Sequence, residues 1–184
     1  MSRISFIILI AICFSANQGI CQTRGNSCTC KAPVISSHPA SVSGLCVANG
    51  QANYTVAATG TGPLNYQWQE NQVNINDNSI YSGTHTPTLT INNPSINQNN
   101  KSYRCLITNC SGTIVYTNNL STLNLNIMPT DLNTDGVTDN GDFSILLRVY
   151  GTSCTGCKED IDQDGNINVV DFLRLIGRYN QACF

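Results

Sequence analysis

Apolar and polar residues alternate in short runs between residues 33 and 127. In the last of these runs, Leu123, Leu125 and Ile127 alternate with asparagines, so a strand here would bury one face and expose the other. Turn residues such as Gly-Thr-Gly-Pro at 60–63 separate the runs, and no helical period competes with the alternation. Many short strands at this spacing predict a β-sandwich or barrel.

Two aromatic residues narrow this fold class. Trp68 lies in the sequence Tyr-Gln-Trp, and Tyr103 lies two residues before Cys105. This pattern resembles an immunoglobulin-like domain, in which a core tryptophan occupies strand C and a tyrosine precedes the cysteine of strand F. The resemblance covers residues 33–127 and implies that Trp68 is buried in the core of a sandwich.

The cysteine of strand B does not follow this pattern. The family's cysteine would fall near Val56, whereas Cys46 lies 22 residues before Trp68, which is too early for that role. The resemblance therefore implies one of two states for Cys105. It is either a buried free thiol that packs as a small hydrophobe, which we favour, or it is bridged to Cys46.

Eight of the ten cysteines follow residue 21. An even number in an exported chain indicates disulfides, although the spacing does not give their connectivity. In an immunoglobulin-like domain the segment before strand A lies close to the end of strand F. The resemblance thus implies a bridge from Cys28 or Cys30 to Cys110. A metal site at Cys154 and Cys157 is not favoured, because no second pair of this kind is present.

The carboxy-terminal part has a different pattern, an acidic segment that occurs twice, 29 residues apart, at 131–142 and 160–171. Both segments carry oxygen-bearing side chains at positions 1, 3, 5, 9 and 12, a glycine at position 6, and a backbone carbonyl available at position 7. This is the spacing of an EF-hand loop, which surrounds Ca²⁺ with six to eight oxygens. The pattern predicts two calcium ions, held by Asp131, Asn133, Asp135, Val137, Asp139 and Asp142 and by Asp160, Asp162, Asp164, Asn166, Asn168 and Asp171.

An apolar segment with helical period follows each loop, at 143–150 and 172–179, but no helix is expected before either loop. Two loop-then-helix units over residues 131–180 resemble the type I dockerin module of secreted bacterial proteins. The resemblance implies a small α-helical module that folds with calcium and docks onto a cohesin domain. Docking would use loop positions 10 and 11, which are Asn140-Gly141 and Val169-Val170 here. Both pairs differ from the Ser-Thr pair of well-known dockerins, so the resemblance predicts calcium more strongly than a cohesin.

The two candidate docking positions differ in polarity. Asn140-Gly141 is small and polar, whereas Val169-Val170 is branched and apolar. One interpretation is a single docking mode centred on the two valines, with Arg174 and Arg178 at its rim, because interface cores favour apolar contacts. The alternative is that one valine turns inward.

Charge and side-chain chemistry exclude other classes of protein. Residues 22–126 hold four basic and two acidic side chains, and residues 127–184 hold four basic and nine acidic ones. No basic stripe is present to bind nucleic acid. Outside the calcium loops the acids are Glu70, Asp77 and Glu159, which we interpret as solvated surface rather than as the paired carboxylates of a glycosidase. The sequence therefore predicts that the protein is not an enzyme.

The amino terminus predicts export. Arg3 precedes an apolar run at 4–14, which has the length of a signal peptide and is too short to span a membrane. We expect a signal peptide at 1–21, a cysteine-containing segment at 22–32, the immunoglobulin-like domain at 33–127, and the dockerin-like domain at 128–184.

Two functions follow from this organisation. The first is a secreted, extracellular or cell-surface, non-catalytic calcium-binding protein. Its dockerin-like module would attach it to an extracellular protein such as a cohesin, and its immunoglobulin-like domain would act in adhesion or as a spacer. The alternative is a carbohydrate-binding or accessory protein in polysaccharide degradation, with Tyr81 or Tyr116 exposed to a glycan.

Overall fold

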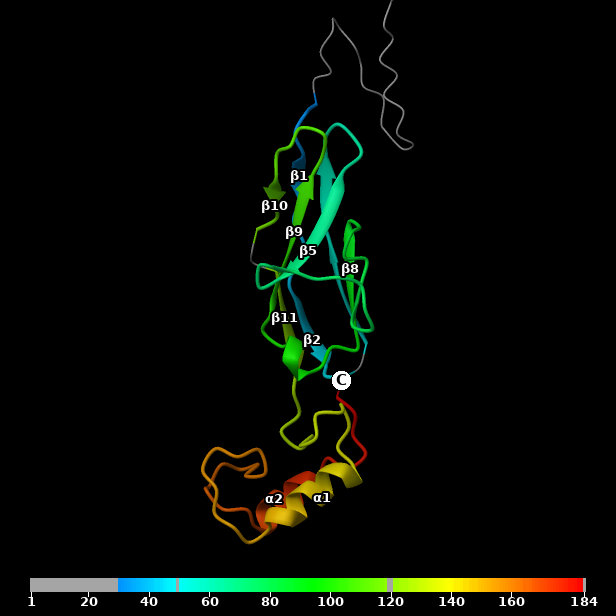
Figure 1. The fold of residues 1–184 in the computed structure, drawn as a ribbon. Coiled ribbons are helices and arrows are strands. Elements are labelled where there is room, and N and C mark those ends of the chain that lie inside the picture. Colours follow the sequence, from blue (N-terminus) through cyan, green and yellow to red (C-terminus); the bar gives the residue numbers. More distant parts are fainter. Residues whose placement is uncertain (1–29, 49, 119–120, 184) are drawn as a thin grey trace, which may run out of the picture.

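A computed structural model of the chain describes residues 30–48, 50–118 and 121–183 (Figure 1). These residues form a β-sandwich with a smaller helical part at one end, so that the molecule is elongated. The predicted signal peptide and Cys28 lie outside the described residues.

The strands of the sandwich form three hydrogen-bonded sets. The first pairs β1 (Val34–Ser37) with β4 (Ala57–Thr59), and the second has the order β3 (Gln51–Thr55), β8 (Thr88–Asn92), β7 (Tyr81–Ser82). The third has the order β2 (Val42–Cys46), β11 (Ser121–Asn126), β9 (Ser102–Thr108), β5 (Asn65–Glu70), β6 (Val73–Asn74), and β10 (Val115–Tyr116) pairs with β9. β2 runs parallel to β11, and the 3₁₀ helix η1 (Ile96–Gln98) precedes β9.

The core of the sandwich forms where the predicted alternation places it. Trp68 on β5 pairs with Cys105 on β9, and both are 0% exposed. The indole Nε1 of Trp68 donates a hydrogen bond to the carbonyl oxygen of Thr86 at 2.9 Å, and the Tyr54 ring lies 5.1 Å from that of Tyr103. The prediction of a buried Trp68 is confirmed. A core of this kind, enclosed by the strands of a β-sandwich, is that of an immunoglobulin-like domain.

Two of the cysteine predictions are confirmed. Cys105 is buried and free, and Cys30 is bonded to Cys110. Cys46, the alternative partner for Cys105, is instead bonded to Cys183, 137 residues away in the sequence.

The interpretation of Glu70 as solvated surface is wrong. Its carboxylate accepts hydrogen bonds from the hydroxyl groups of Tyr81 and Tyr103, the second at 2.9 Å, and it lies 3.7 Å from the ammonium group of Lys101. Tyr81 is 7% exposed, so it is not available to a glycan as predicted. Asp77 is exposed, but its carboxylate accepts hydrogen bonds from the backbone amide and the hydroxyl of Thr84 at 2.8 and 2.6 Å.

The carboxy-terminal part consists of two loop-then-helix repeats, with α1 (Asn140–Val149) and α2 (Val169–Ile176) packed together. Leu146 and Leu175 occupy equivalent positions in the two repeats and are both fully buried. The rings of Phe143 and Phe172 meet at 5.2 Å. Both helices begin three residues earlier than the apolar segments that predicted them.

The connection between the two parts also differs from the prediction. β11 ends at Asn126, and Ile127 is 42% exposed instead of continuing the buried face of Leu123 and Leu125. The chain leaves the sheet at this point and leads into the first loop. In the described ranges there is no helix with the length and apolar character that a membrane crossing requires.

Candidate metal centre

The first position of each loop organises the turn that follows it. The carboxylate of Asp131 accepts hydrogen bonds from the amides of Asp135 and Gly136 at 3.1 and 2.9 Å. The equivalent Asp160 accepts from the amides of Asp164 and Gly165 at 3.1 and 2.9 Å. The two loops, 29 residues apart, therefore have the same local hydrogen bonding.

The twelfth position of each loop closes it. Asp142 accepts hydrogen bonds from the amides of Asn133 and Asp139 at 3.0 and 2.8 Å. Asp171 accepts from the amides of Asp162 and Asn168 at 3.2 and 2.9 Å, and from that of Ile161. Asp142 and Asp171 are fully buried. Each side chain thus joins the start of its helix to the start of its loop.

The ninth position of each loop is the N-cap of the following helix. The side chain of Asp139 accepts from the amide of Gly141, and that of Asn168 accepts from the amide of Val170, both at 2.7 Å. The acid three residues later completes a capping box in both helices. The loop spacing predicts these residues only as metal ligands. Their spacing also matches a capping signal, and this explains why the helices start earlier than predicted.

The sharp turn predicted at position 6 is present in both loops. Gly136 has a φ of +96° and Gly165 a φ of +88°, a left-handed conformation that glycine adopts at little cost. The surroundings of the two glycines differ. A Cβ atom at Gly136 would lie 2.6 Å from the carbonyl oxygen of Val47, whereas Gly165 faces open space. The first loop therefore lies directly against the sandwich.

The remaining predicted ligands lie along the same two turns. The carboxylate oxygens of Asp160, Asp162 and Asp164 lie within 4.8 Å of one another, and no other such cluster occurs among the described residues. In the first loop the third position is an amide, and Asn133 Nδ2 donates to the carboxylate of Asp135 at 2.9 Å. The amides at position 7, those of Val137 and Asn166, donate to the carboxylate at position 5 at 3.0 and 2.8 Å.

The negative charges of the loop carboxylates are not balanced by basic side chains. Burial raises the pKa of Asp131, and the negative charges of Asp142 and Asp135 raise it further, while the hydrogen bonds from the amides of Gly136 and Asp135 oppose the shift. Within the described part of the chain, no lysine or arginine forms an ion pair with a loop carboxylate. The donor set, rich in carboxylate oxygen and without nitrogen or sulfur, fits a hard divalent cation.

Each loop is supported by the segment that follows the helix of the other repeat. The amides of Gly151 and Cys154 donate to the carbonyl groups of Ile167 and Gly165 at 2.8 and 2.9 Å. In the other repeat, the amides of Asn180 and Cys183 donate to the carbonyl groups of Thr138 and Gly136 at 2.7 and 3.4 Å. These pairs are related by the same 29-residue shift, so the module has internal two-fold symmetry. The spacing of the two loops along the sequence does not predict this pairing.

The predicted docking residues differ in exposure as well as in polarity. On α2 one exposed apolar stripe consists of Val169, Val170, Leu173 and Ile176, which are 53%, 40%, 60% and 47% exposed. The alternative in which one valine turns inward is wrong. On α1 the equivalent positions are Asn140, Gly141, Ser144 and Leu147, of which only Leu147 is apolar.

Comparisons with known proteins concern the sandwich. No protein-family description matches this chain, and no curated protein matches it. Similar solved structures include tandem Ig repeats of Dlar, with 25% identity and a TM-score of 0.43 over 52% of this chain and 48% of that one. A titin Ig tandem has 22% identity and a TM-score of 0.46 over 54% of this chain and 49% of that one. Extracellular domains 3–5 of Drosophila OTK have 19% identity and a TM-score of 0.43 over 53% of this chain and 33% of that one.

The match spans about half the length of this Dlar chain and of this titin tandem. On its own strand order, and on the pairing of Trp68 with Cys105 in its core, the sandwich is an immunoglobulin-like domain.

Proposed function

We propose that this is an exported, non-catalytic protein whose carboxy-terminal module binds two calcium ions and attaches the chain to an extracellular protein. The disulfides fit an extracellular location, and the apolar run at 4–14 would direct export. The immunoglobulin-like domain would then serve in adhesion or as a spacer.

The observation that carries the calcium assignment is the set of four buried carboxylates at positions 1 and 12 of the loops. Asp131, Asp142, Asp160 and Asp171 are 5%, 0%, 4% and 0% exposed. Burying a charged group is costly unless a counter-charge or hydrogen bonds compensate it. Backbone amides compensate part of this cost, and a divalent cation in each loop would compensate the rest.

The cation would be held by the residues at positions 1, 3, 5, 7, 9 and 12 of each loop. When bound, it would neutralise the carboxylates and bring their oxygens together. The chain's own contribution is the glycine turn at position 6 and the hydrogen bonds from backbone amides, which orient the carboxylates toward the inside of the loop.

Attachment is assigned to the exposed stripe of α2. Apolar contacts at the centre of an interface with charged residues at the edge are typical of protein docking surfaces. A cohesin-like domain is the partner that the dockerin resemblance implies. The glycan alternative is less well supported. Tyr81 is buried in the core, and the guanidinium carbon of Arg104 lies over the ring of Tyr116, 4.6 Å from its centroid.

Calcium titration by calorimetry on the full chain tests the calcium assignment. We expect two ions per chain, with helical circular dichroism lost on chelation, because the carboxylates repel one another without the ion. Asp135→Ala and Asp164→Ala should each remove one ion and leave the fluorescence of Trp68 unchanged. A chain that binds no calcium and keeps its helical signal in EDTA would refute the assignment.

A further inference from the structure

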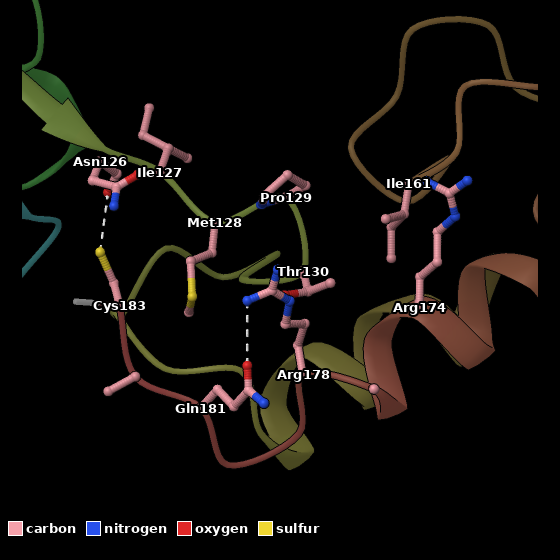
Figure 2. A pocket seen from close by; sticks show the side chains of 12 residues that line it. Asn126, Ile127, Met128, Pro129, Thr130, Ile161, Arg174, Arg178, Gln181 and Cys183 are labelled. Atoms are coloured by element: carbon pink, nitrogen blue, oxygen red, sulfur yellow. Dashed lines mark hydrogen bonds between the residues drawn. The ribbon is translucent and has the colours of Figure 1, made fainter.

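A cavity of about 640 Å³ lies between the linker 126–130 on one side and the end of α2 with the segment that follows it on the other (Figure 2). Its apolar lining comes mainly from Ile127, Met128, Pro129 and Ile161, and its charged lining comes from Arg174 and Arg178. Figure 2 shows Arg178, two residues beyond the end of α2, reaching toward Met128 and Thr130, whereas Arg174 on α2 extends beside Ile161, away from Arg178.

The cavity is positively charged in a negatively charged part of the chain. Residues 127–184 contain nine acidic and four basic residues, and two of those four basic residues line the cavity. No acidic residue belongs to the lining. Because neither arginine forms an ion pair with any residue that the structure describes, an anionic side chain placed beside Arg174 or beside Arg178 would be stabilised by an uncompensated positive charge.

The two guanidinium groups are free to bind a ligand. Arg178 Nη1 donates one hydrogen bond, to Gln181 Oε1 at 3.3 Å. Over the described ranges, Arg174 has neither a side-chain hydrogen bond nor an ion pair. Both residues are exposed.

The internal two-fold symmetry shows that these arginines are particular to the second repeat. The equivalent positions in the first repeat are Ile145 and Val149, which pack against the core of the module with Ile161. Basic residues in the last turn of a helix also stabilise its dipole, and both Arg148 on α1 and Arg174 on α2 have that place. Arg178 lies beyond the end of α2 and also lines the cavity, so the helix dipole does not account for the pair of arginines there.

We propose that this cavity binds an acidic, apolar segment of the docking partner, with one carboxylate side chain held by Arg174 and a second held by Arg178. This inference rests on the proposed docking function. Guanidinium groups pair with carboxylates through two parallel hydrogen bonds, and the apolar lining suits the aliphatic part of the same segment. Val170 lies one turn before Arg174 on α2, so one partner surface reaches both the exposed stripe and the cavity.

The test uses the full, calcium-loaded chain and a fluorescein-labelled peptide, acetyl-Leu-Glu-Ala-Leu-Glu-amide, followed by fluorescence anisotropy. The control peptide has glutamine in place of both glutamates. We expect the acidic peptide to bind at least about tenfold more tightly than the control, because a guanidinium group forms stronger hydrogen bonds with a charged carboxylate than with a neutral amide. The double variant Arg174→Gln/Arg178→Gln should lose this preference, and the matched control Arg148→Gln should keep it.

Equal binding of the two peptides, or equal losses in the double variant and in Arg148→Gln, would overturn the proposal. Tighter binding of a trigalacturonate than of the acidic peptide would overturn the assignment to a polypeptide. Calcium content is measured on every variant. If Val170→Asp abolishes partner capture while the double arginine variant does not, the docking function stands and the cavity assignment is wrong.

Discussion

Cys183, in the last described segment of the chain, is covalently bonded to Cys46 at the end of β2. Its counterpart in the first repeat, Cys154, is bonded instead to Cys157, three residues later. The two cysteines occupy equivalent positions in the repeats. The backbone amide of each donates a hydrogen bond to the carbonyl group of the glycine at position 6 of one loop, Cys183 to Gly136 and Cys154 to Gly165. One disulfide therefore ties the first loop to the sandwich, and the other closes a local turn next to the second loop.

Removal of the long-range disulfide should weaken calcium binding at the first of the two proposed sites. In Cys46→Ala/Cys183→Ala the segment that supports Gly136 loses its covalent anchor, and we expect the free energy of unfolding to fall by about 2–5 kcal/mol. Calorimetric calcium titration should show weaker binding at one site. The matched variant Cys154→Ala/Cys157→Ala should weaken the second site. Each double variant is also combined with Asp135→Ala or with Asp164→Ala, which removes one site, so that the remaining binding can be assigned to one loop. If both double variants weaken the same site, the two-fold assignment of the supports is wrong.

Tyr54 carries a buried hydroxyl group without a hydrogen-bond partner among the described residues. An unsatisfied buried hydroxyl costs about 1–3 kcal/mol, so Tyr54→Phe should raise the free energy of unfolding or leave it unchanged. Tyr103→Phe is the matched control, because its hydroxyl donates to Glu70 at 2.9 Å and its loss should destabilise the sandwich by about 1 kcal/mol or more. Chemical denaturation followed by Trp68 fluorescence measures both. Equal destabilisation by the two substitutions would contradict this assignment.

The buried thiol of Cys105 should make the free energy of unfolding depend on pH in the alkaline range. Burial raises its pKa from 9.0 to about 12. The unfolded chain therefore releases this proton before the folded chain does. The contribution of the protonated Cys105 thiol to the free energy of unfolding is fully present below pH 9 and is lost as the pH rises toward 12. Between these values the free energy of unfolding should fall with pH, and Cys105→Ala should make the fall less steep.

The same burial should protect the thiol from alkylation. At about pH 9 native Cys105 should react with iodoacetamide far more slowly than in denaturant, because the thiolate is the reactive form. Mass-spectrometric peptide mapping identifies the alkylated position. Rapid native labelling of Cys105 would show that the core at β9 is open.

The exposed stripe of α2 should dominate partner capture. Val170→Asp places a charge in the stripe, and its position in the first turn of α2 favours an acid, so the helix should remain intact. The matched control is Asn140→Asp on α1, which keeps an oxygen for the hydrogen bond from the hydroxyl of Tyr179. In calcium-dependent pull-down from the native secretome, the loss of captured partner should be at least about tenfold greater for Val170→Asp than for Asn140→Asp, as expected for a substitution at the centre of an interface. Equal losses would show that either repeat docks.

Much of this protein is determined by local sequence. The alternation along β9 places Tyr103 and Cys105 in the core, because successive residues of a strand face opposite sides. The 29-residue repeat predicts both loops and their following helices, because a glycine turn, a capping residue and a helical period each act over a few residues. The buried Trp68 and the free Cys105 followed from the immunoglobulin-like pattern.

Other features depend on contacts that no local pattern encodes. Glu70 was expected on the surface, but the folding of β7 and β9 around β5 brings the hydroxyl groups of Tyr81 and Tyr103 to its carboxylate. The bond between Cys46 and Cys183 and the mutual support of the two loops join segments far apart in the chain. Only the tertiary structure decides such pairings, because they depend on how the sandwich and the helices pack against each other rather than on the spacing of the residues along the sequence.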